Sequence, residues 1–148
     1  MATAAKLGAV RRSTAADEAW QLMQGLFGVH KRRVIALCQE FDLAPQQLIA
    51  VRLLDPAAPS PMSALAEQLH CDNSNVTGIV DRLEARGLVA RRSAEHDRRV
   101  KMLDLTERGA IVRERLAERF DEAPPQLAAL SAADQRALRD LLRKAVGD

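Results

Sequence analysis

Several ingredients of common functional classes are scarce in this 148-residue chain. It has two cysteines, no tyrosine and 3% aromatic residues, and its formal net charge is only +2. Two cysteines are too few for the disulfide framework of a small secreted domain. The scarcity of aromatic side chains argues against recognition of single-stranded nucleic acid by base stacking. No apolar run approaches the roughly 20 residues that a membrane-spanning helix needs, so we expect no membrane association.

The motifs of common enzyme classes are also missing. The chain has no phosphate-binding glycine loop, no nucleophile elbow and no pair of histidines at metal-ligand spacing. His70, Cys71 and His96 come nearest to a ligand set, and their spacing matches no standard zinc site. We therefore expect neither an enzyme nor a cofactor or metal site.

The first residues have little apolar character. Residues 1–10 contain no sustained apolar region and are followed by Arg11 and Arg12, so the pattern predicts no signal peptide and a cytoplasmic location. Residues 1–15 are rich in alanine and are predicted to form a mobile N-terminal arm that frays in solution. A basic arm near DNA is the alternative interpretation, because Lys6 accompanies the two arginines.

The segment from Asp72 to Arg86 has the pattern of an amphipathic helix. Its start offers N-cap oxygens, and its apolar stripe consists of Val76, Ile79, Val80 and Leu83. The opposite face is polar and consists of Ser74, Asn75, Thr77, Gly78, Asp81 and Arg82. Such a face can read base edges, because Asn and Arg pair bidentately with adenine and guanine. A solvated helix face is the alternative for this helix taken alone.

Gly78 is an unusual choice inside a helix. It costs about 1 kcal/mol of helix propensity relative to alanine. Close approach of this face to another backbone is one reason to tolerate that cost.

A charged hairpin is predicted directly after this helix. Gly87 stands where a left-handed C-cap is expected, residues 88–92 resemble a strand, residues 93–97 have turn composition, and residues 98–105 resume a strand. Residues 86–101 contain six cations and two acids, a local balance of +4 in a chain of net charge +2. Basic charge is therefore concentrated where a wing would meet the phosphate backbone of a duplex.

The rest of the chain is predicted to be helical. Helices are expected over about 16–41 and 45–54, then a proline-rich loop over 55–61, then a short helix that precedes the polar one. Thr106 can cap a further helix that ends or kinks at Pro124, and Ser131 opens a last helix with an apolar stripe. The order predicts a mainly α fold with a small β wing, a winged helix-turn-helix.

These residues resemble the MarR-type winged-helix transcriptional regulators. The resemblance is carried by an ordered set of motifs: Ala64 to Ala66, Cys71 to Thr77, Val80 to Val89, Asp97 to Arg99 and Leu105 to Gly109. It implies a winged helix-turn-helix over residues 43–105, flanked by N- and C-terminal dimerisation helices over 16–42 and 106–148. It also implies a sequence-specific regulator of transcription that binds double-stranded DNA. A repressor is favoured, although the sequence does not distinguish repression from activation.

The resemblance also implies roles for individual residues. Asp97 would orient Arg99 into a minor groove, whose negative potential attracts arginine where it is narrow, and Arg98 would touch phosphate. The residues in or beside the major groove would be Asn73, Ser74, Asn75, Thr77 and Arg82. The sequence does not separate their base contacts from their phosphate contacts.

A homodimer is expected from the terminal helices. Their apolar stripes exceed what a winged helix of about sixty residues can cover, and a symmetric second copy is the economical partner. Two-fold symmetry would place the two recognition helices about 34–36 Å apart and call for a pseudo-palindromic operator.

Regulation by a small molecule is implied by the resemblance alone. Relatives release DNA when a small aromatic or anionic effector enters the crevice between the two regions. The candidate residues here are Trp20, Met23, Phe27, His30 and Arg33, although core and dimer contacts explain their helical spacing more simply. The sequence does not identify an effector or establish that one exists.

Two other functions remain open at this stage. Cys71 precedes a helix N-terminus, which can lower a thiol pKa, so a redox-sensing regulator is one alternative to a simple packing role. A winged helix that binds only another protein is the second, because a fold does not dictate function.

Overall fold

The computed structural model describes residues 13–147. The elements are α1 (Ala15–Glu40), α2 (Pro45–Leu53), β1 (Ser60–Pro61), α3 (Met62–Gln68), α4 (Asn73–Ala85), β2 (Val89–Ser93), β3 (Lys101–Leu105), α5 (Glu107–Asp121), α6 (Pro125–Ala128) and α7 (Ala132–Val146). The architecture is the mainly helical winged helix-turn-helix that the sequence predicts. No helix among the described residues is long and apolar enough to cross a membrane.

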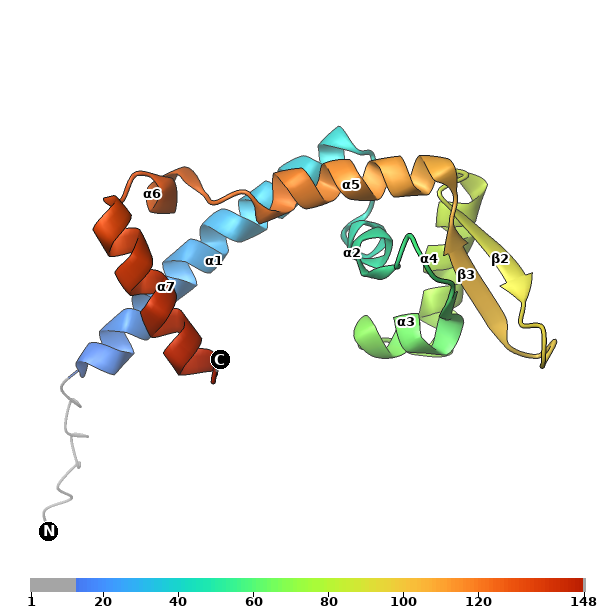
Figure 1. Cartoon of the computed structure of the whole chain (residues 1–148), viewed down its shortest axis with the longest axis horizontal. Helices are drawn as coiled ribbons and strands as arrows, with labels where there is room; N and C mark the ends of the chain where they lie inside the picture. Colours follow the sequence, from blue (N-terminus) through green and yellow to red (C-terminus); the bar gives the residue numbers. More distant parts are fainter. Residues whose placement is uncertain (1–12, 148) are drawn as a thin grey trace, which may run out of the picture.

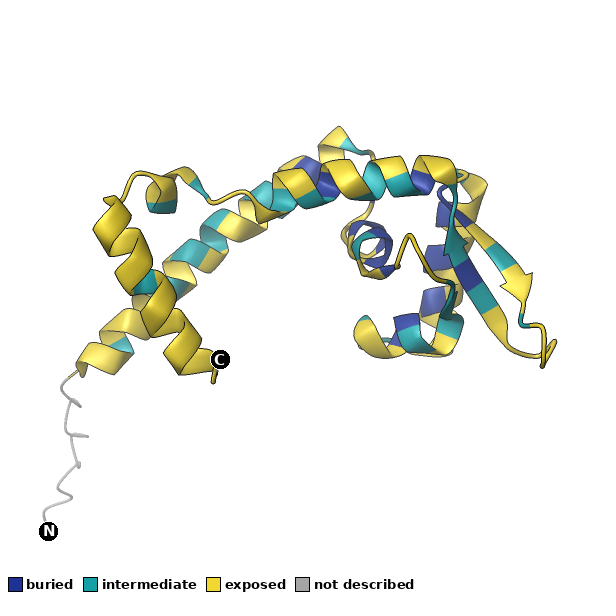
Figure 2. Cartoon of the chain, in the orientation of Figure 1, coloured by how far each residue is buried: buried dark blue, intermediate teal, exposed yellow. Residues whose placement is uncertain are grey.

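The molecule is elongated, with the winged helix at one end and α6, α7 and the start of α1 at the other (Figure 1). Two long helices, α1 and α5, join the two ends. The buried side chains gather in the winged-helix half, whereas the opposite end is almost entirely exposed (Figure 2). The largest fully buried side chains are Leu48, Leu54, Leu65, Leu83, Leu103, Leu116, Val51, Val76, Val80 and Val89.

The sheet has three strands in the order β1-β3-β2, all antiparallel to their neighbours. The sequence predicts only the hairpin of β2 and β3 and a loop over residues 55–61. Ser60 and Pro61 nevertheless pair with Leu103 and Met102 of β3. A two-residue strand leaves no periodicity to detect, and proline is tolerated because β1 is at the sheet edge.

The caps of α1 and α5 follow from the sequence. Thr14 and Asp17 form a reciprocal capping box at the start of α1. Thr106 caps α5 through Gly109 N–H, and its hydroxyl also donates to the carbonyl of Gly87, 2.6 Å away. Gly87 itself has φ +66°, as expected for a left-handed C-cap. Thr106 therefore ties the start of α5 to the end of the recognition helix.

The N-terminal arm prediction falls mostly outside the described residues. Residues 1–12 are not described, whereas Thr14 already caps α1 and Ala15 begins it. Toward the other end of the chain, α5 ends at Asp121, before Pro124, and Pro125 begins the short α6, as the backbone restrictions of proline predict.

Candidate nucleic-acid interface

The recognition helix α4 begins at a well-formed cap. One carboxylate oxygen of Asp72 accepts the backbone N–H of Asn75 at 2.8 Å and the hydroxyl of Ser74 at 2.7 Å. These two hydrogen bonds, the backbone one first, lower the pKa of the Asp72 carboxyl, because they stabilise its ionised form. The first turn of α4 is thereby held by an anion at the positive end of the helix.

The two faces of α4 differ as the sequence predicts. The apolar stripe from Val76 to Leu83 is buried against the core. The predicted DNA-binding residues of this helix are all exposed: Asn73, Ser74, Asn75, Thr77 and Arg82. A surface of hydrogen-bonding side chains therefore faces outward along the length of α4.

Not every polar side chain on that face is equally available. The Ser74 hydroxyl donates to Asp72, and the Thr77 hydroxyl donates to the carbonyl of Asn73 at 2.7 Å. In this arrangement both hydroxyls can only accept a further hydrogen bond. Within the described part of the chain, the side chains of Asn75 and Arg82 make no hydrogen bond or ion pair, so both remain free to bind a ligand.

The wing tip is organised around Asp97. Its side chain accepts the backbone N–H of Arg99 at 2.9 Å, and its carbonyl accepts the N–H of Val100 at 3.0 Å. The contact to Arg99 is therefore with the backbone and not with the guanidinium. Arg98 and Arg99 are exposed, and their guanidinium groups have no acceptor among residues 13–147.

The recognition helix and the wing share one groove of about 360 Å³. It brings together three predicted residues, Asn73 and Thr77 from α4 and Arg99 from the wing. Ser63 and Lys101 also line it, and sequence analysis did not single them out. Lys101 was counted only as part of the basic wing, and Ser63 has no sequence signal beyond its place at the start of α3. Met62 and Val100 complete the lining, so the groove combines apolar surface with polar side chains and two cations. The cations suit an anionic ligand.

Half of the six cations in residues 86–101 pair with acids in the structure, namely Arg86, Arg91 and Arg92. Arg86 pairs with Asp42 at 3.2 Å, and Arg92 pairs with Asp104 at 2.6 Å. Lys101 donates to the Ser93 hydroxyl at 3.1 Å. The acids in these pairs lie outside residues 86–101. Arg98 and Arg99 at the wing tip, and Lys101 at the start of β3, have no acidic partner among residues 13–147.

Arg91 has a structural role of its own. Its guanidinium pairs with Asp81 at 2.5 Å and with Glu84 at 3.5 Å, and it donates to the carbonyl of Thr77 at 3.2 Å. Glu84 in turn accepts the backbone N–H of Arg91. This cluster, here called the Arg91 strap, fastens the start of the wing to the carboxyl half of α4.

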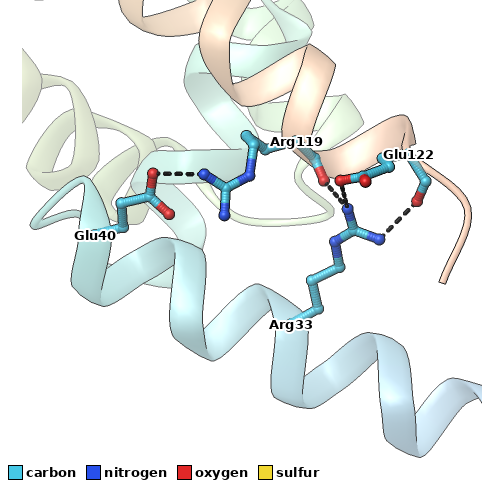
Figure 3. A network of polar contacts seen from close by, with 4 residues as sticks. All are labelled: Arg33, Glu40, Arg119 and Glu122. Carbon is cyan, nitrogen blue, oxygen red and sulfur yellow. Dashed lines mark hydrogen bonds and ion pairs between the residues drawn. The ribbon is translucent and has the colours of Figure 1, made fainter. Parts of the chain in front are cut away.

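The five candidate effector residues make separate contacts. Trp20 and Phe27 are about half exposed and meet edge to face, with ring centroids 6.2 Å apart. His30 meets Phe120 of α5 in the same way at 5.0 Å. Arg33 binds the carboxyl end of α5 (Figure 3). Met23 is half buried. Two of the five residues thus contact α5 itself.

Among residues 13–147, neither cysteine belongs to a cluster that could hold a metal. Cys38 and Cys71 both pack against the hydrophobic core, and burial raises the pKa of the Cys38 thiol. No group of three or more metal-ligating side chains occurs within residues 13–147.

Comparison with known proteins identifies the family. A model of the MarR family matches residues 43–101. Two curated relatives are 30% identical to this chain. The HTH-type transcriptional regulator YdgJ of Bacillus subtilis, described as uncharacterized, aligns over 94% of this chain and 85% of that protein. The HTH-type transcriptional repressor NicR of Pseudomonas putida aligns over 78% and 76%. With several other curated relatives the match spans about half of their length.

The fold agrees with the same assignment. The solved structure of a MarR family protein from Bacillus stearothermophilus superimposes with a TM-score of 0.77 at 26% identity, over 89% of this chain and 93% of that one. The relatives are transcriptional regulators and not enzymes, in agreement with the absence of enzyme motifs from the sequence. The chain therefore belongs to the MarR family of winged-helix transcriptional regulators.

Proposed function

We propose that this protein is a homodimeric repressor that binds a pseudo-palindromic operator in double-stranded DNA. One observation carries the proposal. Asn73 and Thr77, from the exposed polar face of α4, line a single groove together with Arg99 of the wing tip. An α-helix of this kind fits the major groove, and an arginine at a hairpin tip fits the adjacent minor groove.

The proposed contacts divide by chemistry. Asn75 and Arg82 have free side chains and are the best candidates for bidentate base contacts. Ser74 and Thr77 present acceptors, which suit an amino group on a base edge. Arg99 is assigned to the minor groove, with its backbone held by Asp97, and Arg98 and Asn73 to phosphate.

The dimer is supported by apolar surface that one chain leaves uncovered. An open groove of about 590 Å³ lies between α6 and α7, lined by apolar side chains that include Leu127, Leu138 and Leu142. Leu22 of α1 and Leu141 of α7 are 74% and 66% exposed. Exposed apolar patches of this kind mark protein interfaces, and a second copy offers the same patch in return.

Release by a small aromatic or anionic effector is part of the same proposal. Trp20, Met23, Phe27 and His30 offer aromatic and apolar contacts on the same helix as the cation Arg33. An anionic effector would have to compete with Glu122 for the Arg33 guanidinium. Binding at this place would therefore disturb a contact between α1 and α5.

The first experiment is a titration of the purified protein onto duplex DNA from upstream of its own gene, followed by fluorescence anisotropy. Scrambled duplex is the control, and several salt concentrations are compared. Tight, salt-dependent binding that discriminates against scrambled DNA is expected. The absence of binding to either duplex at low salt would overturn the proposal and favour a protein partner.

Single substitutions then test the placement of the arginines. Arg99→Ala or Arg82→Ala should weaken operator binding by about 1–3 kcal/mol, the scale of one good arginine contact. Arg115→Ala is the matched control, because Arg115 is exposed on α5, outside both α4 and the wing. Wild-type affinity in both Arg99→Ala and Arg82→Ala would contradict the assignment.

A further inference from the structure

The carboxyl end of α5 is capped by an arginine from another helix. Arg33 of α1 donates one guanidinium nitrogen to the carbonyl of Glu122 at 2.6 Å. The second nitrogen donates to the carbonyl of Arg119 and to the Glu122 carboxylate, the latter at 2.9 Å (Figure 3). One side chain thus binds two backbone carbonyls and one carboxylate, 86 to 89 positions away in the sequence.

The capping is explained by what α5 lacks. The last carbonyls of any helix have no partner within the helix. Many helices satisfy them with a glycine in the left-handed conformation, but Glu122 has φ −60° and ψ 130° and makes no such turn. A guanidinium suits this place, because its planar fork donates in two directions and its charge complements the negative end of the helix dipole. The Arg33 side chain is 23% exposed, so water competes only in part.

Neighbouring contacts fix the same end of α5 to two helices. Arg119 pairs with Glu40 of α1 at 2.9 Å (Figure 3). Arg52 of α2 pairs with Asp121 at 2.9 Å, and its guanidinium lies 3.7 Å from the centre of the Phe120 ring. The last turn of α5 is therefore held in a defined place relative to α1 and α2.

The other end of α5 belongs to the DNA-binding part. Thr106 bonds the carbonyl of Gly87 directly after α4, and a Cβ on Gly109 would lie 1.9 Å from the carbonyl oxygen of Leu88. Fifteen residues of helix form a lever of about 22 Å. A tilt of about 5° at the Arg33 end would displace the other end by about 2 Å over that length, and α4 would follow it.

We propose that Arg33 is a positioning residue that sets the separation of the two recognition helices in the dimer without touching DNA. This inference rests on the proposed homodimeric DNA binding. Arg33 holds α5 at one angle to α1, α1 and α7 meet the second copy, and α5 carries α4. The residue therefore determines which spacing between operator half-sites the dimer accepts.

The test uses three variants of the 148-residue chain. Arg33→Met removes the charge and the donors but keeps an apolar stem. Arg33→Lys keeps the charge as a compact ammonium but lacks the planar fork that places two donor nitrogens against the two carbonyls. Arg32→Met is the matched control, because Arg32 is its exposed neighbour and makes no hydrogen bond or ion pair within residues 13–147. Thermal unfolding of each variant shows whether it folds.

Binding is measured on three kinds of duplex: the operator, operators with the half-site spacing changed by one or two base pairs, and a single half-site. Wild type and Arg32→Met should prefer the native spacing by about 10²-fold, since two sites bind together only when the geometry permits. Arg33→Met should reduce this preference below about tenfold and leave half-site affinity within about twofold. Arg33→Lys should lie between them. An unchanged spacing preference in Arg33→Met, or an equal loss of affinity on every duplex, would overturn the inference.

A measurement without DNA separates this inference from the proposed function. Spin labels at Asn75→Cys, in a background without the native cysteines, report the distance between the two α4 helices by electron paramagnetic resonance. The distance distribution should broaden in Arg33→Met and stay narrow in Arg32→Met. A narrow distance distribution in Arg33→Met would refute the positioning role, even if the titrations show that the protein binds the operator. The absence of a dipolar signal in wild type would instead refute the homodimer, and the inference with it.

Discussion

Asp72 holds the start of the recognition helix with a single carboxylate oxygen. That oxygen accepts hydrogen bonds from the Asn75 backbone and the Ser74 hydroxyl. The ionised carboxylate accepts both hydrogen bonds better than the neutral acid does. The two bonds therefore lower the pKa of Asp72. The first turn of α4 also presents Asn73, Ser74 and Asn75, so the cap fixes the direction of three proposed DNA contacts.

Asp72 should make the stability of the protein depend on pH in the acid range. Its pKa is lower in the folded than in the unfolded state, so its contribution is complete above the unfolded-state pKa of about 4 and is lost as the pH falls through the folded-state value. Asp72→Asn keeps a capping side chain but cannot ionise. Urea unfolding from pH 7 to pH 3, at fixed protein concentration, should show the two proteins converging as the pH falls. Parallel curves would contradict the prediction.

Gly78 is the second residue whose role can be isolated. A Cβ at this position would meet nothing within 4 Å in the chain itself. The glycine therefore has no packing reason within the described structure, although it lies inside a helix on the exposed polar face. Close approach of DNA to this face would explain it.

Gly78→Ala should change stability and DNA affinity in opposite directions. Without DNA, the free energy of unfolding should rise by roughly 0.5–1 kcal/mol, because alanine favours the helix. Operator affinity should fall, because the added methyl group stands where the duplex approaches. Gly109→Ala is the contrasting variant, since its Cβ would lie 1.9 Å from the Leu88 oxygen, and we expect it to destabilise by about 1–3 kcal/mol or more. Unchanged operator affinity in Gly78→Ala would remove the proposed reason for the glycine.

At the scale of elements, the Arg91 strap joins the wing to α4. Arg91 was counted with the basic wing in the sequence, but its charge is used internally by Asp81 and Glu84. The strap fixes the angle between the helix assigned to the major groove and the hairpin assigned to the minor groove. The Arg91 side chain is only 25% exposed and is paired with Asp81. We therefore expect the strap to affect DNA binding by holding this angle and not by contacting DNA.

Breaking the strap should weaken DNA binding without removing a DNA contact. Arg91→Ala should lower the free energy of unfolding by about 1–2 kcal/mol. The effect is limited because Asp81 and Glu84 are substantially exposed and water screens both ion pairs. A double-mutant cycle with Asp81→Asn should give a coupling of about 0.5–1 kcal/mol. Operator affinity should fall with little change in its salt dependence, since a residue bound to phosphate would change the slope. A slope reduced by about one unit would indicate that Arg91 touches phosphate instead.

The elements that the sequence predicts best are those with local signals. Examples are the apolar stripe of α4, the left-handed Gly87 and the Thr106 cap. Each depends only on residue types within a few positions along the chain. The strand β1 escapes prediction because two residues carry no pattern. The partners of Arg33 and Arg92 are not predicted, because Glu122 lies 89 positions from Arg33 and Asp104 reaches Arg92 from the opposite strand.

At the scale of the whole molecule, burial is distributed unevenly. The core fills the winged helix, and none of the residues of α7 is buried in the single chain (Figure 2). Yet α7 is strongly amphipathic, with Leu138, Leu141, Leu142 and Val146 at helical spacing. An amphipathic helix gains most of its stability from packing its apolar face. The end of the molecule that holds α7 therefore needs a partner to be stable.

The apolar face of α7 should be the centre of the proposed dimer interface. Leu141→Glu places one charge on that face in each copy, and burial of a leucine contributes about 1.5–3 kcal/mol. Because the substitution occurs twice across a two-fold axis, the dimer should weaken by about 3–6 kcal/mol, or about 10²–10⁴-fold in its dissociation constant. Sedimentation equilibrium at micromolar concentration should then show monomers for Leu141→Glu and dimers for wild type. Arg136→Glu, on the opposite face of the same helix, is the control and should remain dimeric. A wild type that sediments as a monomer would refute the dimer, and a dimeric Leu141→Glu would move the interface away from α7.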